Sequence, residues 1–229
     1  RCDQYRLGNI KVLRDYGIEN VTTNNNSWMN NPHTYCVVAR YSNSKELIGG
    51  VRIQIADGIH PLPVEEAIGY LDKTIHEKVN HYAINGGIGE SCGLWVAKEV
   101  KGMNIARYLM WASVSSANQL NFSTMLGICA GYTLKLFDEI GFVIDKSLGN
   151  QGDFPYPNSD YIAHVIGILN ALTLDTTTKT DKDIMLILRK SPIQVKVEKN
   201  KRFESTISYN LKYESISKIN YQPVEKIAD

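Results

Sequence analysis

The stretch V-A-K-E-V-K-G-M-N-I-A-R-Y-L-M, residues 96–110, decides the fold class of this chain. It begins with residues typical of a strand end, has Gly102 near its centre, and shows helical spacing of apolar residues from Ile105 onward. A strand that passes through a tight turn into a helix leaves unbonded N–H groups at the helix start, backed by the helix dipole. Because such a start suits a pyrophosphate, we predict a ligand-binding turn between Val96 and Ala106.

The segments after this turn predict further helices and strands. Residues 105–120 predict a helix, because small and apolar side chains line one side and no Gly or Pro interrupts it. Residues 124–130 are continuously apolar, as in a buried central strand, and residues 132–140 predict a helix that ends at Gly141. Farther on we predict a loop over 150–160, a strand or helix over 163–174, a strand over 184–188, and a final hairpin from 193–197 and 206–213.

The segments before the turn predict an antiparallel hairpin, because strand-like residues 35–41 and 47–56 are joined by a short polar turn. The other segments are a helix over 6–16, a loop over 22–32, a helix over 61–81, a loop with Gly86, Gly87 and Gly89, and a short strand over 94–97. A hairpin followed by strand–helix–strand–helix predicts an α/β fold of the α+β type, with a central mixed β-sheet flanked by helices. We predict one domain over 1–190 and a C-terminal β extension over 191–229, packed on the domain or on a partner subunit.

Two motifs carry a family resemblance. Residues 101–106, K-G-M-N-I-A, resemble the R/Q-x-x-G-x-G/A donor-binding motif of the GNAT (GCN5-related N-acetyltransferase-like) acyltransferase superfamily. Residues 136–142, L-F-D-E-I-G-F, resemble the closing helix of that family. The resemblance covers residues 94–142 and implies a GNAT-like acyl-CoA N-acyltransferase fold. It also implies acyl transfer from a thioester donor to the amine of a small molecule or amino acid.

The motifs depart from the family pattern at three positions. Lys101 replaces the usual Arg or Gln, and Asn104 replaces the central glycine, although Asn tolerates a left-handed backbone better than most residues. Phe137 stands where many members have a tyrosine that acts as general acid. Asn104 and Phe137, together with Gly93, which replaces an Arg in a further motif, motivate an alternative function, a non-catalytic GNAT-like module that binds a ligand or a partner.

A narrower resemblance links the chain to acyl-homoserine-lactone synthases and long-chain N-acyl amino acid synthases. Their early G-x-x-R and the Pro-containing loop after it correspond to residues 49–52, G-G-V-R, and 60–65, H-P-L-P-V-E. Their E-x-S-R corresponds to residues 90–93, E-S-C-G, where Gly93 replaces the Arg. Since those enzymes use acyl carrier protein, the donor is left open between acyl-CoA and acyl-phosphopantetheine on acyl carrier protein, a co-substrate rather than a permanently bound cofactor.

The resemblance assigns roles to individual residues. Glu90 is the candidate general base, with a surface Glu in a glycine-rich loop as the alternative. Arg52 is the candidate acceptor-binding residue, since an Arg in an apolar strand requires a carboxylate from the substrate or from the protein. Tyr132 could replace the missing phenol or be a packing residue. The donor-binding residues implied are Trp95, Val96, Ala97, Lys101, Gly102, Met103, Asn104, Ile105, Ala106 and Arg107.

Composition sets limits on other functions. The chain has 229 residues, of which 43% are hydrophobic and 21% charged, as in a soluble globular protein, and its net charge of +1 argues against nucleic acid binding. We expect no membrane span, since no apolar run reaches about 18 residues. The four cysteines and five histidines lack metal-site spacing, so we predict no metal and, with scattered thiols, a cytoplasmic protein. Alternating residues in 206–213 also make a homodimer a candidate.

Overall fold

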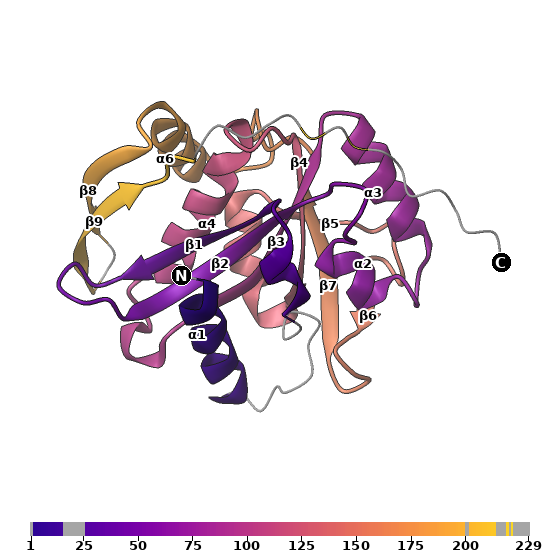
Figure 1. Ribbon diagram of the computed structural model, residues 1–229, viewed down its shortest axis with the longest axis horizontal. Coiled ribbons are helices and arrows are strands. Elements are labelled where there is room, and N and C mark those ends of the chain that lie inside the picture. The colour runs from indigo at the N-terminus through magenta and orange to yellow at the C-terminus, as the bar shows by residue number, and fades with distance from the viewer. Residues whose placement is uncertain (1, 16–25, 200–201, 214–218, 220, 222–229) are drawn as a thin grey trace.

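The computed structural model describes residues 2–15, 26–199, 202–213, 219 and 221, and its centre is a mixed β-sheet (Figure 1). Seven strands of the described chain form this sheet in the order β1-β2-β3-β4-β7-β5, with β6 also paired to β7. Only β3 and β4 run parallel, and the other neighbours are antiparallel. The strands are β1 (Thr34–Arg40), β2 (Leu47–Ile55), β3 (Ile88–Val96), β4 (Thr124–Ala130), β5 (Val143–Ile144), β6 (Asp153–Pro155) and β7 (Ile162–Ile168). The predicted mixed sheet is confirmed.

Helices cover both faces of the sheet. Val51 and Ile53 of β2 point into the larger core, where they meet α4, and α5 and α6 pack beside α4 on this face. The opposite face carries α1, α2 and α3, as Figure 1 shows for α1 in front of the sheet and α4 behind it. The helices are α1 (Cys2–Asp15), α2 (Pro63–Ile68), α3 (Thr74–Ile84), α4 (Ile105–Ser115), α5 (Leu134–Ile140) and α6 (Lys179–Lys190).

The parallel strands β3 and β4 diverge after a short paired segment. Their register runs only from Ile88 opposite Thr124 to Glu90 opposite Leu126, although both strands continue. Farther along, β3 bulges against β2, because Gly50 faces Trp95 while Arg52 faces Cys92. The strand pair therefore opens toward the start of α4.

Gly93 explains why one family motif is altered. It lies in this bulge with φ +58°, where residues with a Cβ are strained. A Cβ at Gly93 would come within 2.5 Å of the Tyr5 hydroxyl, which donates a 2.6 Å hydrogen bond to the Gly93 carbonyl. The narrower resemblance places an Arg at this position. Here the position is a glycine, and Tyr5 of α1 packs against it.

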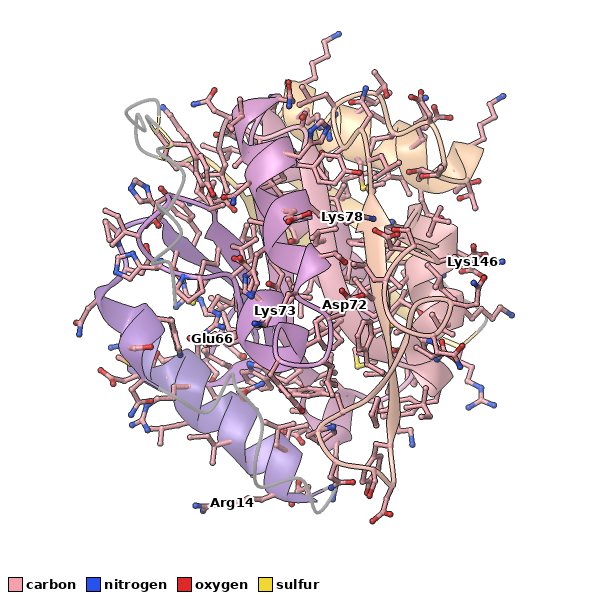
Figure 2. All side chains as sticks on the ribbon, turned by 90° about the vertical axis from the view of Figure 1, so that its right-hand side faces the viewer. Arg14, Glu66, Asp72, Lys73, Lys78 and Lys146 are labelled. Carbon is pink, nitrogen blue, oxygen red and sulfur yellow. The ribbon has the colours of Figure 1, made fainter. Side chains whose placement is uncertain are left out.

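The helix predicted over 61–81 is wrong as a single element. The structure has α2 and α3, separated at residues 69–73. Asp72 causes the break, because its carboxylate accepts the backbone N–H of Thr74 at 3.0 Å and that of Gly149 at 2.8 Å. Figure 2 shows Asp72 and Lys73 at this junction.

The strand predicted over 184–188 is also wrong, since these residues lie within α6. The continuous apolar run hides a helical period, because Met185 and Leu188 are buried while Leu186 and Ile187 are exposed. Thr178 caps this helix by accepting the N–H of Asp181.

Several boundaries also move. The strand expected over 94–97 begins at Ile88, so Gly89 lies in β3 and not in a loop. The helix from Ile105 ends at Ser115 with a 3₁₀ turn after it, and the helix expected from 132 begins at Leu134. The loop expected over 150–160 contains β6, the ambiguous segment 163–174 contributes to strand β7, and part of the loop expected over 22–32 lies outside the described residues.

The predicted C-terminal hairpin is present as a separate two-stranded sheet, β8 (Ile193–Lys199) and β9 (Glu204–Asn210). On β8 the apolar residues Ile193, Val195 and Val197 are exposed. The opposite side of the hairpin packs on the domain, with Tyr209 of β9 and, just after it, Leu211 buried in the larger core. That side is therefore not available for pairing with another subunit.

Two further findings concern the described residues only. None of their helices is both long and apolar enough to cross a membrane. No group of three or more of their His, Cys, Asp and Glu side chains is arranged to hold a metal ion. None of Cys36, Cys92 and Cys129 is in a disulfide; Cys92 and Cys129 are buried, and Cys36 is half-buried.

Candidate active site

The predicted donor-binding residues gather around one pocket. It has a volume of about 320 Å³ and lies where β3 ends, α4 begins and α5 passes nearby. Of the predicted residues, Trp95 and Met103 do not line it, and Trp95 packs instead against Tyr5 and Trp28 beneath α1. The lining consists of Val96, Ala97, Lys98, Val100, Lys101, Gly102, Asn104, Ile105, Ala106, Arg107 and Leu136.

The backbone at the start of α4 takes the shape that the motif predicts. Asn104 is left-handed with φ 61°, and Gly102 has φ +87°. The first backbone bond of α4 runs from the Tyr108 N–H to the Asn104 carbonyl at 3.1 Å, so the N–H groups of residues 105–107 do not bond within the helix. The Asn104 side chain is hydrogen-bonded to the Tyr108 hydroxyl. This leaves N–H groups at the pocket that suit an anion.

Only some of the cationic side chains near this pocket are available to bind an anionic ligand. The Arg107 guanidinium is paired with Asp181 at 2.9 Å and with Glu139, which ties α4 to α6 and α5. Lys98 lies 3.3 Å from Asp15, whereas Lys101 forms no ion pair with any described residue. Among the predicted donor-binding side chains, Lys101 is therefore better placed than Arg107 to meet an anion. The N–H of Ala97 is also engaged, since it donates to the Ile48 carbonyl at 2.9 Å.

Glu90 is not a surface residue in a loop, as one reading of the sequence had it. It lies within β3 and is fully buried, beside Gln54 of β2. Oε2 accepts the N–H of Val64 at 2.8 Å, and Oε1 has no hydrogen-bond partner among the described residues. Burial raises the pKa of this carboxyl from 4.5 to about 8, so it is largely neutral at pH 7.

Arg52 is a buried cation without a protein carboxylate. No described carboxylate oxygen lies within the 4.0 Å of a salt bridge. Its guanidinium lies 4.8 Å from the centre of the Trp28 ring, and Nε donates to Cys92 Sγ at 3.1 Å. Burial raises the pKa of the Cys92 thiol to about 11, so this partner is neutral. Among the described residues, therefore, Arg52 does not form the internal salt bridge that the sequence left open as an alternative.

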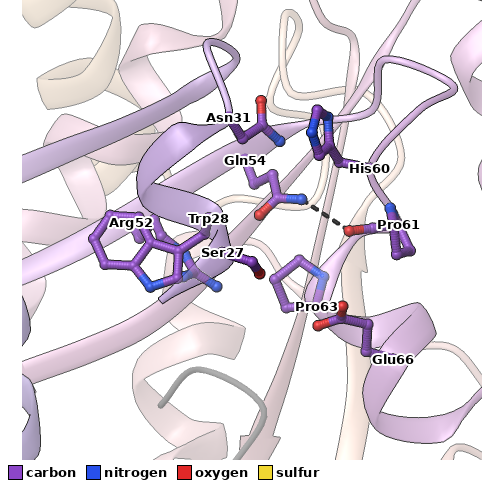
Figure 3. A pocket seen from close by; sticks show the side chains of 9 residues that line it. All are labelled: Ser27, Trp28, Asn31, Arg52, Gln54, His60, Pro61, Pro63 and Glu66. Atoms are coloured by element: carbon purple, nitrogen blue, oxygen red, sulfur yellow. Dashed lines mark hydrogen bonds between the residues drawn. The ribbon is translucent and has the colours of Figure 1, made fainter. Parts of the chain in front are cut away.

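A second, small pocket of about 50 Å³ opens beside Arg52 (Figure 3). Glu66 of α2 faces it, and burial raises the pKa of that carboxyl. Gln54 is fixed at its floor by donating to the Pro61 carbonyl at 2.8 Å. The lining consists of Ser27, Trp28, Asn31, Arg52, Gln54, His60, Pro61, Pro63 and Glu66. A cation and a carboxylate facing one small space suit a head group that carries both charges.

Comparison with solved structures identifies the architecture. FeeM, an N-acyl amino acid synthase from uncultured soil microbes, superposes with a TM-score of 0.59 at 14% identity, over 77% of this chain and 94% of FeeM. TofI, solved in a ternary complex with an inhibitor and MTA, gives 0.50 at 14% identity, over 79% and 89%. The chain has the GNAT-like acyltransferase fold. No protein-family model and no curated protein matches the sequence.

Neither Phe137, which stands at the position of the family's tyrosine, nor Tyr132, the candidate replacement for that phenol, lines either of the two pockets. Phe137 is buried on α5 with its ring 5.4 Å from that of Phe142, in a T-shaped contact. Tyr132 lies on a 3₁₀ turn before α5 and is 83% exposed. The structure therefore brings no phenol into the lining of the α4 pocket.

Sequence reasoning missed most of the residues around Arg52. Trp28 comes from a 3₁₀ turn before β1, and Glu66 comes from α2, so their approach depends on tertiary packing. In the sequence His60 is visible only as the first residue of the Pro-containing loop over 60–65. One usable signal was Asp57 three residues before His60, a spacing that suits a side-chain bond in a turn.

Proposed function

We propose that the protein is an N-acyltransferase that moves an acyl group from a thioester donor to the amine of an amino acid or another small molecule. The observation that carries this proposal is the opening between β3 and β4, which leads to a pocket at the start of α4. A fold shared with an N-acyl amino acid synthase supports it.

In this proposal the donor's phosphates bind at the unbonded N–H groups of α4, next to Lys101. The pantetheine arm then follows the free end of β3, where Val96 and Ala97 line the pocket. The donor is acyl-CoA or acyl-phosphopantetheine on acyl carrier protein, and Lys98 and Lys101 suit the phosphates of the one and the acidic surface of the other equally.

The acceptor binds in the small pocket beside Arg52. The guanidinium pairs with an acceptor carboxylate and Glu66 faces the ammonium group, so an amino acid fits both charges. The ammonium group of the acceptor first loses one proton, which reaches solvent. Glu90, once ionised, then takes a second proton from the attacking nitrogen through a water at Oε1, which has no hydrogen-bond partner among the described residues. The C–N bond forms, the C–S bond breaks, and that proton passes to the departing thiolate.

The test is incubation of the full chain with acetyl-CoA, palmitoyl-CoA and palmitoyl acyl carrier protein, each with a mixture of the twenty common amino acids. Mass spectrometry detects the N-acyl product. We expect Glu90→Gln to lose turnover by about 10²-fold or more while it still binds the donor. If no thioester binds, the proposal is wrong.

A non-catalytic binding module is the second candidate. It is favoured by the α4 pocket, which has no phenol in its lining, and by the burial of Phe137. In that case the thioester binds, no N-acyl product forms, and Glu90→Gln changes no binding constant.

A further inference from the structure

An Asp–His pair lies at the rim of the small pocket, in the loop between β2 and α2. The Asp57 carboxyl is buried, and its Oδ1 accepts the backbone N–H groups of Ile59 and His60, each at 2.8 Å. Its Oδ2 lies 2.8 Å from Nδ1 of the His60 ring. Burial opposes the charge, but these hydrogen bonds outweigh it and hold the pKa of Asp57 below its usual value. Asp57 is therefore a carboxylate at neutral pH.

This arrangement fixes the tautomer of His60. A carboxylate only accepts hydrogen bonds, so Nδ1 of the ring carries the proton and donates it to Asp57. Nε2 is then the nitrogen that takes up or releases a proton, and it has no hydrogen-bond partner among the described residues. The ring lines the small pocket, and 42% of its side chain is exposed (Figure 3).

We propose that His60, oriented by Asp57, is the base that takes the first proton from the ammonium group of the acceptor. This inference rests on the proposed function. The ammonium N–H bond breaks, its proton moves to Nε2, and the neutral amine attacks the thioester carbonyl. The imidazolium returns that proton to solvent, while the second proton follows the Glu90 route to sulfur.

The other charged groups at the pocket do not fill this role. Glu90 lines neither pocket and is fully buried, so it does not meet an ammonium ion that enters from solvent. Glu66 of α2 also lines the pocket; burial raises the pKa of its carboxyl, although the charge of nearby Arg52 favours the ionised form. In the proposed function Glu66 faces the ammonium group as a counter-charge and does not take its proton. Tyr221 lies near Asp57 and Glu65, and its pKa is raised, by burial first, so it stays neutral.

The test compares His60→Gln and Asp57→Asn with wild-type protein, using the amino acid that the wild type acylates. We expect kcat/KM of His60→Gln to fall by about 10²–10⁴-fold, and the acid limb of its pH profile to disappear. Asp57→Asn keeps the acceptor for the two N–H groups but turns an amide N–H toward Nδ1. The proton then moves to Nε2, and activity falls although His60 is intact.

His76→Gln is the matched control. His76 is also paired with a carboxylate, Glu65 at 2.8 Å, and its side chain is 46% exposed, but it does not line the pocket. We expect it to keep the wild-type rate and pH profile.

A second measurement needs only the wild-type protein for its deciding result. The ¹⁵N NMR spectrum of histidine-labelled wild-type protein is expected to show His60 protonated at Nδ1, and that of Asp57→Asn at Nε2. A wild-type ring protonated at Nε2 overturns the inference. So does a His60→Gln protein that transfers acyl groups at the wild-type rate and pH profile, which leaves the proposed function intact. A wild-type protein that acylates no amine overturns both.

Discussion

Replacing Glu90 by glutamine is expected to remove a pH dependence from the stability of the protein. The folded-state pKa of Glu90 is raised, so the folded protein holds a proton that the unfolded chain releases. Its contribution to stability is complete below the unfolded value of 4.5 and is lost as pH rises through about 8. Glutamine has a similar shape and never ionises, so it does not show this loss.

The size of the effect follows from the same values. The interval from 4.5 to about 8 is about 3.5 pH units, and at about 1.4 kcal/mol per unit it amounts to about 5 kcal/mol. This is an upper limit, because any movement of α2 away from Glu90 lets water reach the carboxylate and lowers the cost of ionisation. Even half of this value is a large share of the stability of a typical domain.

The assay is urea unfolding of both proteins at intervals from pH 5 to pH 9. The quantity to follow is the wild-type free energy of unfolding minus that of Glu90→Gln, because other titrating groups cancel in this difference. A constant penalty, such as the amide of glutamine lacking a partner at the Oε1 position, shifts the difference without changing its slope. We expect the difference to fall as pH rises toward 8 and then to level off. A difference that stays flat refutes the burial argument for Glu90.

Three further predictions concern other parts of the chain. Arg52→Gln is expected to raise KM for a carboxylate-bearing acceptor by about 10-fold or more, with less effect on an amine that lacks a carboxylate. Steady-state kinetics with the two acceptors measure this difference. Equal effects on both acceptors contradict a role of Arg52 in binding the carboxylate. Arg189→Met is expected to lower the free energy of unfolding by about 3 kcal/mol in urea titrations, because Arg189 donates to the Val114 carbonyl near the end of α4 and to the Ala171 and Leu172 carbonyls after β7. A change under about 0.5 kcal/mol contradicts this reasoning. The sequence made a homodimer a candidate through residues 206–213, but Tyr209 and Leu211 of this segment are buried, so a dimer would have to use the exposed face of β8 instead. If such a dimer forms, Val195→Glu reduces the mass in sedimentation to that of one chain. A wild-type protein already at that mass rules the dimer out.

The elements with a clear local signal were predictable from sequence. Three features follow from the local sequence alone and are present in the structure. They are the hairpin of β1 and β2, the strand β4 and the left-handed Asn104. The α6 segment was not predictable in the same way, because its exposed Leu186 and Ile187 give it the continuous apolar pattern of a strand. The helix can be recognised only from the long-range contacts that bury Met185 and Leu188 on one of its sides.

The strand β3 shows a second reason for failure. Its glycines suggest a loop, yet Gly89 packs with the position of its missing Cβ 3.3 Å from the Phe122 ring, and Gly93 forms the bulge. This error also affects the site, because a surface position in a glycine-rich loop was left open as an alternative for Glu90, which lies between these glycines. A residue's burial here depends on neighbours from α2 and β4 that no local pattern contains.

The departures from the family motifs have structural causes. They also determine which pocket holds groups that could take part in proton transfer. Gly93 makes room for Tyr5 of α1, Phe137 packs against Phe142, and Asn104 bonds to Tyr108, so each departure is used for packing. None of these changes supplies a proton donor or acceptor at the α4 pocket. The titratable side chains that line the α4 pocket are the cations Lys98, Lys101 and Arg107. An imidazole and a carboxylate, His60 and Glu66, line the pocket beside Arg52 instead. If the enzyme is active, proton transfer from the acceptor must therefore begin on the acceptor side of the sheet, and the pH dependence of kcat/KM should follow the acceptor pocket rather than the donor pocket.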